Sequence, residues 1–192
     1  MPGKGATVGF MRAVFREIRL PGDMASQRRG VIMQIDTVRL SIPEGCNIIV
    51  GHSHFMKTIE DLYEVFVSSC PHCKFGIAFC EASQECLIRL EGNDPELVQK
   101  ASENAMNVGA GHTFLCLLKD AFPINVLNAI KSCAEVCTVY CATANPVELI
   151  MAETEQGRGV IGVVDGASPK GIEGSADAEK RKAFLRTIGY KR

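Results

Sequence analysis

The alternation of apolar and polar residues predicts strands and helices from residue 31 onward. Residues 31–42 alternate with a period of two, so that Val38, Leu40 and Ile42 share one side of a half-buried strand. The residues after Thr58 repeat with the period of an amphipathic helix, and Thr58 with Asp61 has the pattern of a capping pair. The same patterns predict strands at residues 46–50, 74–80, 86–90, 113–118 and 135–141, and helices at residues 93–108, 124–133 and 177–189.

Residues 140–171 predict a strand, a loop, a second strand, a tight turn and a third strand, because apolar runs alternate with Asn-Pro and Gly-Arg-Gly. The polar residues of this stretch lie where the strands end. They are Asn145 in the loop, Glu153 and Glu155 after the second strand, Arg158 between two glycines, and Asp165 after the third strand. Side chains of both charges at strand ends are typical of a site for phosphate or a metal. We therefore expect them to converge on one anion-binding pocket.

Strands alternating with helices indicate an α/β fold, in which helices pack on a mixed β-sheet. The same pattern predicts a single domain that ends in a C-terminal β-hairpin and a terminal helix. Residues 33–192 are expected to form the domain. Residues 1–32 are expected to be an N-terminal extension, with one short helix at residues 10–20.

Charge and composition narrow the class of protein. Apolar residues make up 46% of the chain and charged residues 22%, as in ordinary globular domains. Residues 1–32 contain six Lys or Arg and two acidic residues, which leaves 15 basic and 20 acidic residues for the rest. This acidic excess argues against a duplex nucleic-acid surface. The sequence shows neither an apolar run long enough to span a bilayer nor a secretory signal, so a cytoplasmic protein is expected.

Nine cysteines, an odd number, favour reduced thiols over a disulfide framework. The Cys70-Pro-His-Cys73 motif has the spacing of a thiol–disulfide exchange site, but it follows a predicted helix instead of opening one. The helix dipole then disfavours a thiolate, so redox catalysis is not expected. A zinc site is also not expected, because no second Cys-x-x-Cys pair is present.

His52 and His54 alternate along the chain and share one face if the strand continues through them. With His112 or Glu81 from neighbouring strand ends they could hold a metal or contact a substrate, or they could simply form a turn. Gly109 and Gly111 are interpreted as the end of the preceding helix.

Other polar residues form pairs at spacings that suit a ligand. Asn125 and Asn128 lie three residues apart on one helix face, where paired amides suit a purine edge or ribose hydroxyls. Glu153 and Glu155 point to one side of their strand and could bind a cation. Arg158 carries a guanidinium fork that suits phosphate.

These motifs make the sequence similar to the adenosine-specific kinase family from about residue 33 to residue 192. The residues that carry the resemblance are Ile-Pro-Glu-Gly-Cys-Asn (42–47), Gly-His-Ser-His-Phe (51–55), Lys-Phe-Gly-Ile-Ala-Phe-Cys-Glu-Ala-Ser (74–83), Gly-Ala-Gly-His-Thr-Phe (109–114), Pro-Ile-Asn-Val-Leu-Asn-Ala-Ile (123–130), Tyr-Cys-Ala-Thr-Ala-Asn-Pro (140–146), Glu-Thr-Glu-Gln-Gly-Arg-Gly (153–159) and the tail from Arg181. The resemblance implies a compact α/β subunit that binds adenosine and its phosphates, AMP included, and assembles as a homotrimer. From the charge and the short apolar runs, no nucleic-acid or membrane partner is expected.

The leading hypothesis is a phosphotransferase that converts adenosine to AMP with ATP or another phosphate donor and Mg²⁺. The substrate-binding candidates are Asn145, Asn125, Asn128, Lys57, Glu81 and His112. The catalytic candidates are Asp165, His54 and Arg158, and the metal-binding candidates are Glu153 and Glu155.

The sequence has no Gly-x-x-x-x-Gly-Lys-Ser/Thr loop, which keeps a non-catalytic adenine-nucleotide sensor or interaction module open as the alternative. A metal-dependent hydrolase built on His52, His54 and Glu81 is a third hypothesis.

Overall fold

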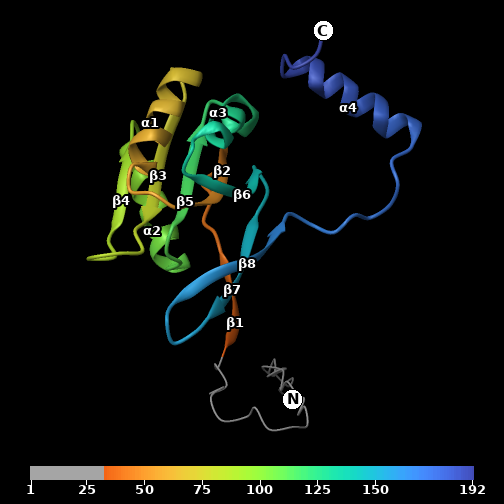
Figure 1. The fold of residues 1–192 in the computed structure, drawn as a ribbon. Helices are drawn as coiled ribbons and strands as arrows, with labels where there is room; N and C mark the ends of the chain where they lie inside the picture. Colours follow the sequence, from red (N-terminus) through yellow and green to blue (C-terminus); the bar gives the residue numbers. More distant parts are fainter. Residues whose placement is uncertain (1–32) are drawn as a thin grey trace, which may run out of the picture. The chain divides into compact units, whose positions relative to one another are not determined.

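The computed structural model describes residues 33–192, whose elements are drawn in Figure 1. The chain divides into two units, Met1–Val31 and Ile32–Arg192. The N-terminal extension and its expected helix at residues 10–20 therefore lie outside the described residues.

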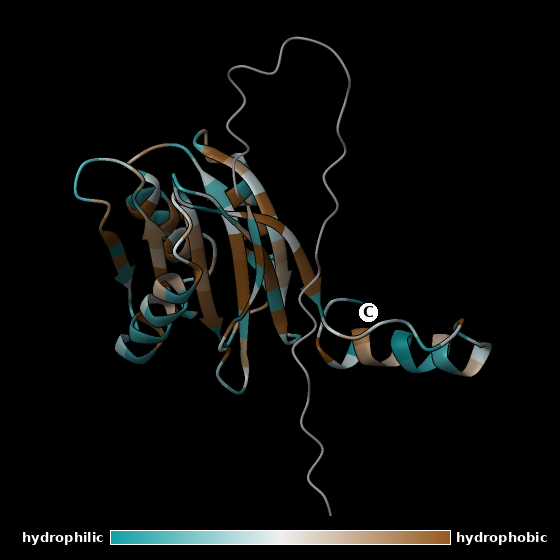
Figure 2. Cartoon of the chain, turned by 90° about the horizontal axis from the view of Figure 1, so that it is seen from below, coloured by the Kyte–Doolittle hydropathy of each residue, from teal (hydrophilic) through white to brown (hydrophobic). Residues whose placement is uncertain are grey.

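A five-stranded sheet forms the centre of the described unit. Its strands are ordered β4 (Ile88–Gly92), β3 (Lys74–Cys80), β5 (Thr113–Lys119), β2 (Cys46–Ser53) and β6 (Val136–Thr143), and every neighbouring pair is antiparallel. The three inner strands are almost entirely apolar and buried, as expected for strands covered on both faces. Figure 2 shows these strands as the brown, hydrophobic layer of the structure.

The two faces of this sheet are covered in different ways. Helices α1 (Thr58–Ser69) and α3 (Leu127–Ser132) pack on the face that carries the large side chains of Phe75, Ile77 and Phe79. Helix α2 (Pro95–Val108) packs on the opposite face, where Ala78 and the glycine at position 76 leave room. A Cβ atom at Gly76 would lie 2.2 Å from the backbone of Leu97, so α2 lies directly against β3.

A second sheet contains β1 (Gln34–Arg39), β7 (Val147–Glu153) and β8 (Arg158–Asp165), in the order β1-β7-β8. Its inward side chains, Val147, Leu149 and Met151, are fully buried and join the same core as α2. The other face of this sheet exposes Ile35 and Ile161. One face of the second sheet therefore completes the core, and the other is left apolar and open.

Helix α4 (Ser175–Thr187) buries none of its residues in the chain. The chain after it returns to the body at Tyr190, whose hydroxyl donates to Asn125 Oδ1 at 3.0 Å. The Tyr190 ring also meets Phe122 edge to face, with 5.8 Å between ring centroids. Phe184, the largest apolar residue of α4, remains exposed.

The predicted α/β class, the C-terminal hairpin and the terminal helix are confirmed. The strands form two antiparallel sheets instead of one mixed sheet, because every pair of hydrogen-bonded neighbours is antiparallel. The helical connections β2–α1–β3 and β4–α2–β5 each pass over one intervening strand. The helix expected at residues 124–133 is divided into a 3₁₀ turn, η1 (Pro123–Asn125), and α3. In the described part of the chain, no helix has both the length and the apolar character to cross a membrane.

Candidate functional site

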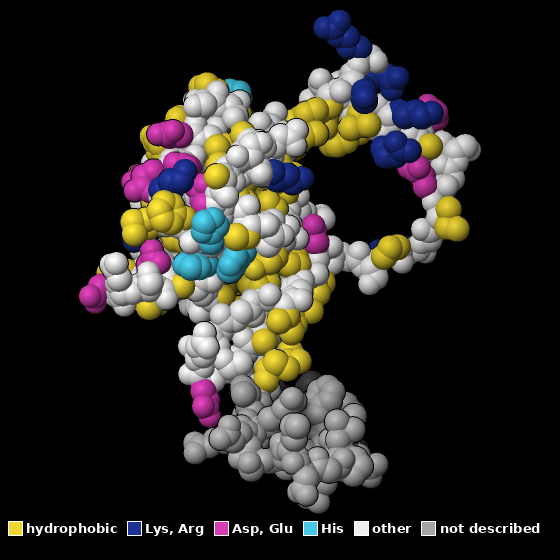
Figure 3. Space-filling model, viewed as in Figure 1, with side chains coloured by type: hydrophobic (Ala, Val, Ile, Leu, Met, Phe, Trp, Pro, Cys, Tyr) yellow, Lys and Arg dark blue, Asp and Glu magenta, His cyan; other side chains and the backbone are white. Residues whose placement is uncertain are grey.

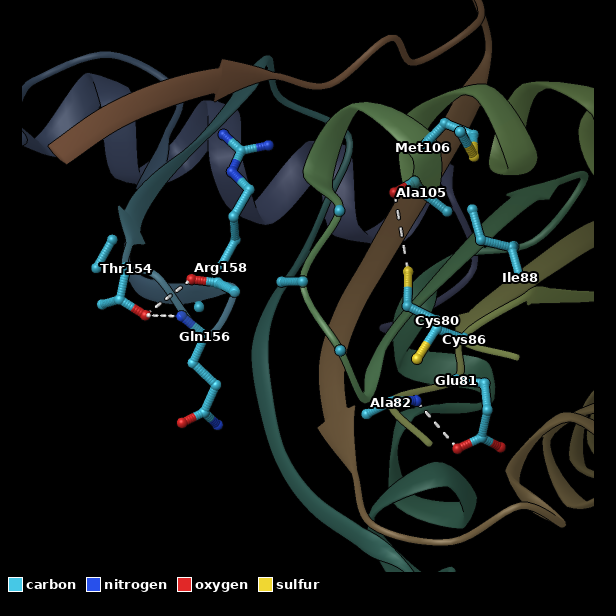
Figure 4. A pocket seen from close by; sticks show the side chains of 16 residues that line it. Cys80, Glu81, Ala82, Cys86, Ile88, Ala105, Met106, Thr154, Gln156 and Arg158 are labelled. Carbon is cyan, nitrogen blue, oxygen red and sulfur yellow. Dashed lines mark hydrogen bonds between the residues drawn. The ribbon is translucent and has the colours of Figure 1, made fainter. Parts of the chain in front are cut away.

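A cavity of about 800 Å³ lies between the β3–β4 connection, the end of α2 and the β7–β8 turn (Figure 4). Its walls combine three kinds of surface. The apolar side chains include Cys80, Ile88, Ala105 and Met106. The exposed backbone belongs to Gly109, Gly111, Gly157 and Gly159, and the polar side chains are Glu81, Thr154, Gln156 and Arg158. A largely apolar cavity with a few polar groups is typical of a small-molecule site.

Glycines at the end of α2 open one wall of this cavity. Gly109 adopts the left-handed conformation with φ 57°, and its N–H donates to the carbonyl of Ala105. This confirms the predicted helix C-cap. A Cβ atom at Gly111 would lie 2.8 Å from the Ala82 Cβ, so a larger residue there would push on the loop across the cavity.

Arg158 lies at the cavity wall and is held on several sides. Its Nη1 donates to the carbonyls of Asn107 and Val108, each at 3.0 Å, which satisfies the last turn of α2. Its Nε lies 3.4 Å from Glu153, and its Nη2 lies 3.9 Å from Asp36. The guanidinium therefore stabilises a helix end beside the cavity, with part of its donor capacity already used.

Glu81 lies at the rim of the cavity. Its Oε1 accepts hydrogen bonds from the Ala82 N–H and the Ser83 hydroxyl, each at 3.0 Å, and its Oε2 lies 2.9 Å from Arg89. Burial alone raises the pKa of this carboxyl, but these hydrogen bonds and the arginine outweigh burial and lower it. A charged carboxylate is therefore fixed at the rim, 3.8 Å from His112 Nε2.

Histidine side chains gather beside this rim, as the cyan group on the body in Figure 3 shows. The rings of His52 and His112 meet edge to face at 5.9 Å, and His112 stacks on Phe79 at 6.0 Å. His112 has a φ of 60°, which is unusual outside glycine. Burial lowers the pKa of His52, and the charges of His112 and His54 lower it further. His52 is therefore a neutral imidazole, able to accept a proton, at neutral pH.

Sequence reasoning missed a second polar cluster, at the start of α1. The predicted Thr58–Asp61 capping pair is wrong, because Lys57 is the N-cap and makes no side-chain cap hydrogen bond. Lys57 instead contacts Asp61 and lies 3.5 Å from the buried Glu135. A single acidic residue directly before the β6 strand was the only sequence signal for Glu135, and acidic residues also occur in exposed loops.

The expected convergence on the C-terminal hairpin does not occur within one chain. The register of β7 and β8 pairs Val147 with Asp165 and Glu153 with Arg158, so the two polar groups lie at opposite ends of the hairpin. Asn145 donates to Asp165 at 3.0 Å at one end. The sequence marks both ends as polar but does not show that strand length separates them.

The remaining predicted residues lie elsewhere. Asn125 Oδ1 accepts from the Phe122 N–H and the Tyr190 hydroxyl, while Asn128 is exposed on α3. Glu155 is exposed in the turn beside the cavity. The roles assigned to these residues from the sequence stay predictions.

Cys70 and Cys73 are buried free thiols after the end of α1, as the order of elements predicted. Burial raises the pKa of Cys73 to about 12, so this thiol is not an activated nucleophile. Within residues 33–192, no three His, Cys, Asp or Glu side chains form a group that could hold a metal ion. The structure therefore gives no support to a hydrolase based on His52, His54 and Glu81.

Comparison with known proteins identifies the family of this chain. A solved structure, the crystal structure of the PH1918 protein from Pyrococcus horikoshii OT3, matches with a TM-score of 0.80 and 43% sequence identity over 84% of this chain and 99% of that chain. No curated protein matched. The family model described as adenosine specific kinase matches residues 38–191, which include both sheets and all four α-helices apart from the first residues of β1. The chain belongs to the adenosine specific kinase family.

Proposed function

We propose that this protein binds adenosine in the cavity and transfers the γ-phosphoryl group of ATP to the adenosine 5′-hydroxyl. The products are AMP and ADP, and the hydroxyl proton goes to a base on the protein. The family supports this reaction class, and the observation that carries it is the cavity whose rim carboxylate, Glu81, lies beside His112. A volume of about 800 Å³ suits a nucleoside-sized ligand.

The cavity lining offers a partner for each part of adenosine. Ile88 and Met106 provide an apolar wall for the base, and Thr154 and Gln156 provide a hydroxyl and an amide for ribose. Asn145, Asn125 and Asn128 do not line this cavity, so their predicted contribution would need a neighbouring subunit.

The sequence named Asp165 and His54 as catalytic candidates that orient the 5′-hydroxyl, and we assign this role, with receipt of the proton, to His54. His54 does not line the cavity itself, but it is exposed two residues after His52. Asp165 accepts a hydrogen bond from Asn145 at the far end of β8. Phosphate charge would be neutralised by Arg158 or Lys57, since phosphoryl transfer depends on positioning and charge stabilisation. Of the carboxylates expected to bind Mg²⁺, Glu153 is already paired with Arg158.

An assay of AMP formation by the purified full-length protein with adenosine, ATP and Mg²⁺ tests the proposal. We expect His54→Asn to slow AMP formation by about 100-fold or more while adenosine affinity changes by less than about threefold. Gln156→Ala should instead weaken adenosine binding by about tenfold. His72→Asn, an exposed histidine at the other end of α1, is the control and should change neither quantity. Wild-type protein that binds no adenosine would refute the proposal.

The alternative is a non-catalytic sensor of adenine nucleotides. It is favoured by the missing phosphate-binding loop and by the hydrogen bonds that occupy Arg158. Calorimetry that shows AMP binding by a protein that forms no AMP from adenosine would establish the sensor in place of the kinase.

We also propose that the protein assembles as a homotrimer through its C-terminal segment. Residues 33–165 contain 8 basic and 17 acidic residues, whereas residues 166–192 contain 7 basic and 3 acidic residues. The basic helix α4 exposes Phe184, and Ile172 is exposed in the segment before it. Such a helix is only marginally stable alone, and the acidic body of a second copy complements its charge. Light scattering should give three chains for the wild type and one for Phe184→Asp; a monomeric wild type would contradict the assembly.

A further inference from the structure

The carboxylate of Glu135 is in an unusual environment at the start of β6. Its side chain is only 2% exposed, and neither of its carboxylate oxygens has a hydrogen-bond partner. Burying an ionised carboxylate without hydrogen bonds is costly, so such a group usually has a cation or a metal beside it. In the described part of the chain, the cation beside Glu135 is the ammonium of Lys57, at 3.5 Å.

The ammonium of Lys57 is shared between two carboxylates. Lys57 also contacts Asp61 in the first turn of α1, and its own side chain is 47% exposed. One positive charge therefore stands between two negative charges, which leaves one negative charge unbalanced. A divalent cation in the same place would balance both carboxylates and would bring more ligand positions than an ammonium.

The surrounding backbone fixes the two carboxylates near each other. The carbonyl of Glu135 accepts from the His54 N–H at 3.1 Å and from the Ser53 hydroxyl at 3.0 Å, which joins the start of β6 to the end of β2. The chain then passes directly into α1, which carries Asp61 one turn later. Glu135 and Asp61 thus come from separate elements that are tied to one short connection.

This connection also reaches the cavity. Arg89 donates to the carbonyl of Met56 at 3.0 Å and lies 2.9 Å from Glu81 at the cavity rim. Arg89 therefore links the segment before α1 to the rim of the cavity. The free N-terminal amides of α1 favour anionic groups, because the helix dipole is positive at this end.

We propose that Glu135 and Asp61 bind one divalent cation of the Mg²⁺ or Mn²⁺ type, and that Lys57 is the resident counter-charge which the cation displaces. Mg²⁺ commonly uses one or two carboxylates and completes its shell with water and substrate phosphate. A role of this ion in phosphoryl transfer rests on the proposed function. Binding of the ion to the protein does not depend on that function.

Titration of the full-length protein with Mn²⁺, without nucleotide, tests the site by calorimetry and by the spin-resonance signal of free Mn²⁺. We expect one ion per chain, displaced by excess Mg²⁺. Glu135→Gln and Asp61→Asn should each weaken Mn²⁺ binding by about tenfold or more, because each removes one charged ligand. Lys57→Met should instead tighten binding, because the competing ammonium is gone. A purely structural ion pair would not produce this increase.

Matched variants separate this site from other acidic residues. Glu60→Gln changes an exposed residue in the same turn, and Glu153→Gln changes a carboxylate at the hairpin; neither should alter Mn²⁺ affinity. Circular dichroism checks that each variant is folded. If Glu135→Gln does not fold, the Mn²⁺ affinity of Asp61→Asn alone tests the site. The proposal is overturned if the wild type binds no Mn²⁺, if binding survives in both ligand variants, or if Glu153→Gln abolishes it. Loss of adenosine binding would instead refute the proposed function and leave this result unchanged.

Discussion

Helices α1 and α2 cover opposite faces of the same sheet, but they differ in how far their polar groups are hydrogen-bonded. At the start of α2, the Asp94 carboxylate accepts from the backbone N–H groups of Glu96 and Leu97, each at 3.1 Å. Inside α2, the buried Asn104 side chain bonds the backbone of Ser41 in both directions, at 2.8 and 2.9 Å. At its end, Arg158 bonds the last carbonyls. The backbone groups at both ends of α2 and its buried Asn104 thus have partners within the chain, and one donor of the side chains that secure it, Arg158 Nε, is buried without a hydrogen bond.

The polar groups at the start of helix α1 are hydrogen-bonded less completely. Its N-cap, Lys57, makes no side-chain cap hydrogen bond, and the adjacent Glu135 has no hydrogen-bond partner for either carboxylate oxygen. Satisfied polar groups stabilise a fold, whereas unsatisfied ones are expected where a ligand binds. The difference indicates that α2 is the rigid support of the cavity and that the start of α1 is the part left available for chemistry.

The largest expected effect concerns how α1 is held to the sheet. Phe66 is fully buried and stacks on Phe75 at 4.6 Å. We expect Phe66→Ala to lower the free energy of unfolding by about 4 kcal/mol, because the change leaves a cavity in the core. Val67→Ala, on the exposed side of α1, should cost less than about 0.5 kcal/mol. Urea denaturation measures both, and a cost below about 1 kcal/mol for Phe66→Ala would show that α1 is not anchored by this ring.

The second effect concerns how closely α2 approaches the sheet. A methyl group at Gly76 would lie 2.2 Å from the α2 backbone, which cannot move as a flexible side chain can. We expect Gly76→Ala to cost about 3 kcal/mol by pushing the first turn of α2 away from β3. Gly171→Ala adds a methyl group where no atom lies within 4 Å and should be nearly neutral. If the two variants melt alike, the close approach of α2 does not limit stability.

Periodic apolar patterns allowed nearly every element of residues 33–192 to be predicted. Phe75, Ile77 and Phe79 alternate with Gly76 and Ala78, and this local pattern already shows which face takes bulky groups. The sheet pairing was less accessible, because antiparallel and mixed sheets can be built from the same strands. The order in space depends on long-range contacts that a local pattern does not encode.

The site was predicted less completely, for a physical reason. Glu81 and His112 were named from the sequence, and the structure brings them to within 3.8 Å. Asn145 and Arg158 were placed in one pocket, but a hairpin separates the two ends of its strands by their full length. Glu135 was missed because burial of a single acidic residue is decided by tertiary packing.

The third effect tests the difference between the two helix starts directly. We expect Asp94→Ala to lower the free energy of unfolding by about 1 kcal/mol, because two backbone N–H groups lose their acceptor. This corresponds to a fall in Tm of about 2–4 °C for a chain of this size. Lys57→Ala removes no cap, because the Lys57 side chain caps no N–H group, but it leaves the buried Glu135 without its counter-charge. The fall in Tm that this causes should disappear in the double variant Lys57→Ala/Glu135→Gln. Asp94→Asn preserves an acceptor and should restore most of the loss.

A fall in Tm for Lys57→Ala/Glu135→Gln as large as that for Asp94→Ala would contradict the comparison. It would mean that the ion pairs of Lys57 stabilise the start of α1 as much as a side-chain cap stabilises α2. In that case the cluster would have a structural role of its own.

The smallest effect is a pH dependence in the strand that leads into α1. Burial, with a smaller contribution from His112 and His54, lowers the pKa of His52 below its ordinary value of 6.5. The unfolded chain then binds this proton more readily than the folded chain, so the contribution of His52 to stability falls as the pH drops below about 6.5. Above that pH the group is neutral in both states and contributes no pH dependence.

Urea denaturation at about pH 7.5, 6.5 and 5.5 checks this sign. In His52→Asn we expect a shallower loss of stability toward acid than in the wild type, whereas His72→Asn, an exposed histidine, should follow the wild type. Parallel curves for wild type and His52→Asn would mean that His52 titrates alike in the folded and unfolded chain. Its ring would then be charged in mild acid, and a neutral imidazole could no longer be assumed beside the cavity rim under those conditions.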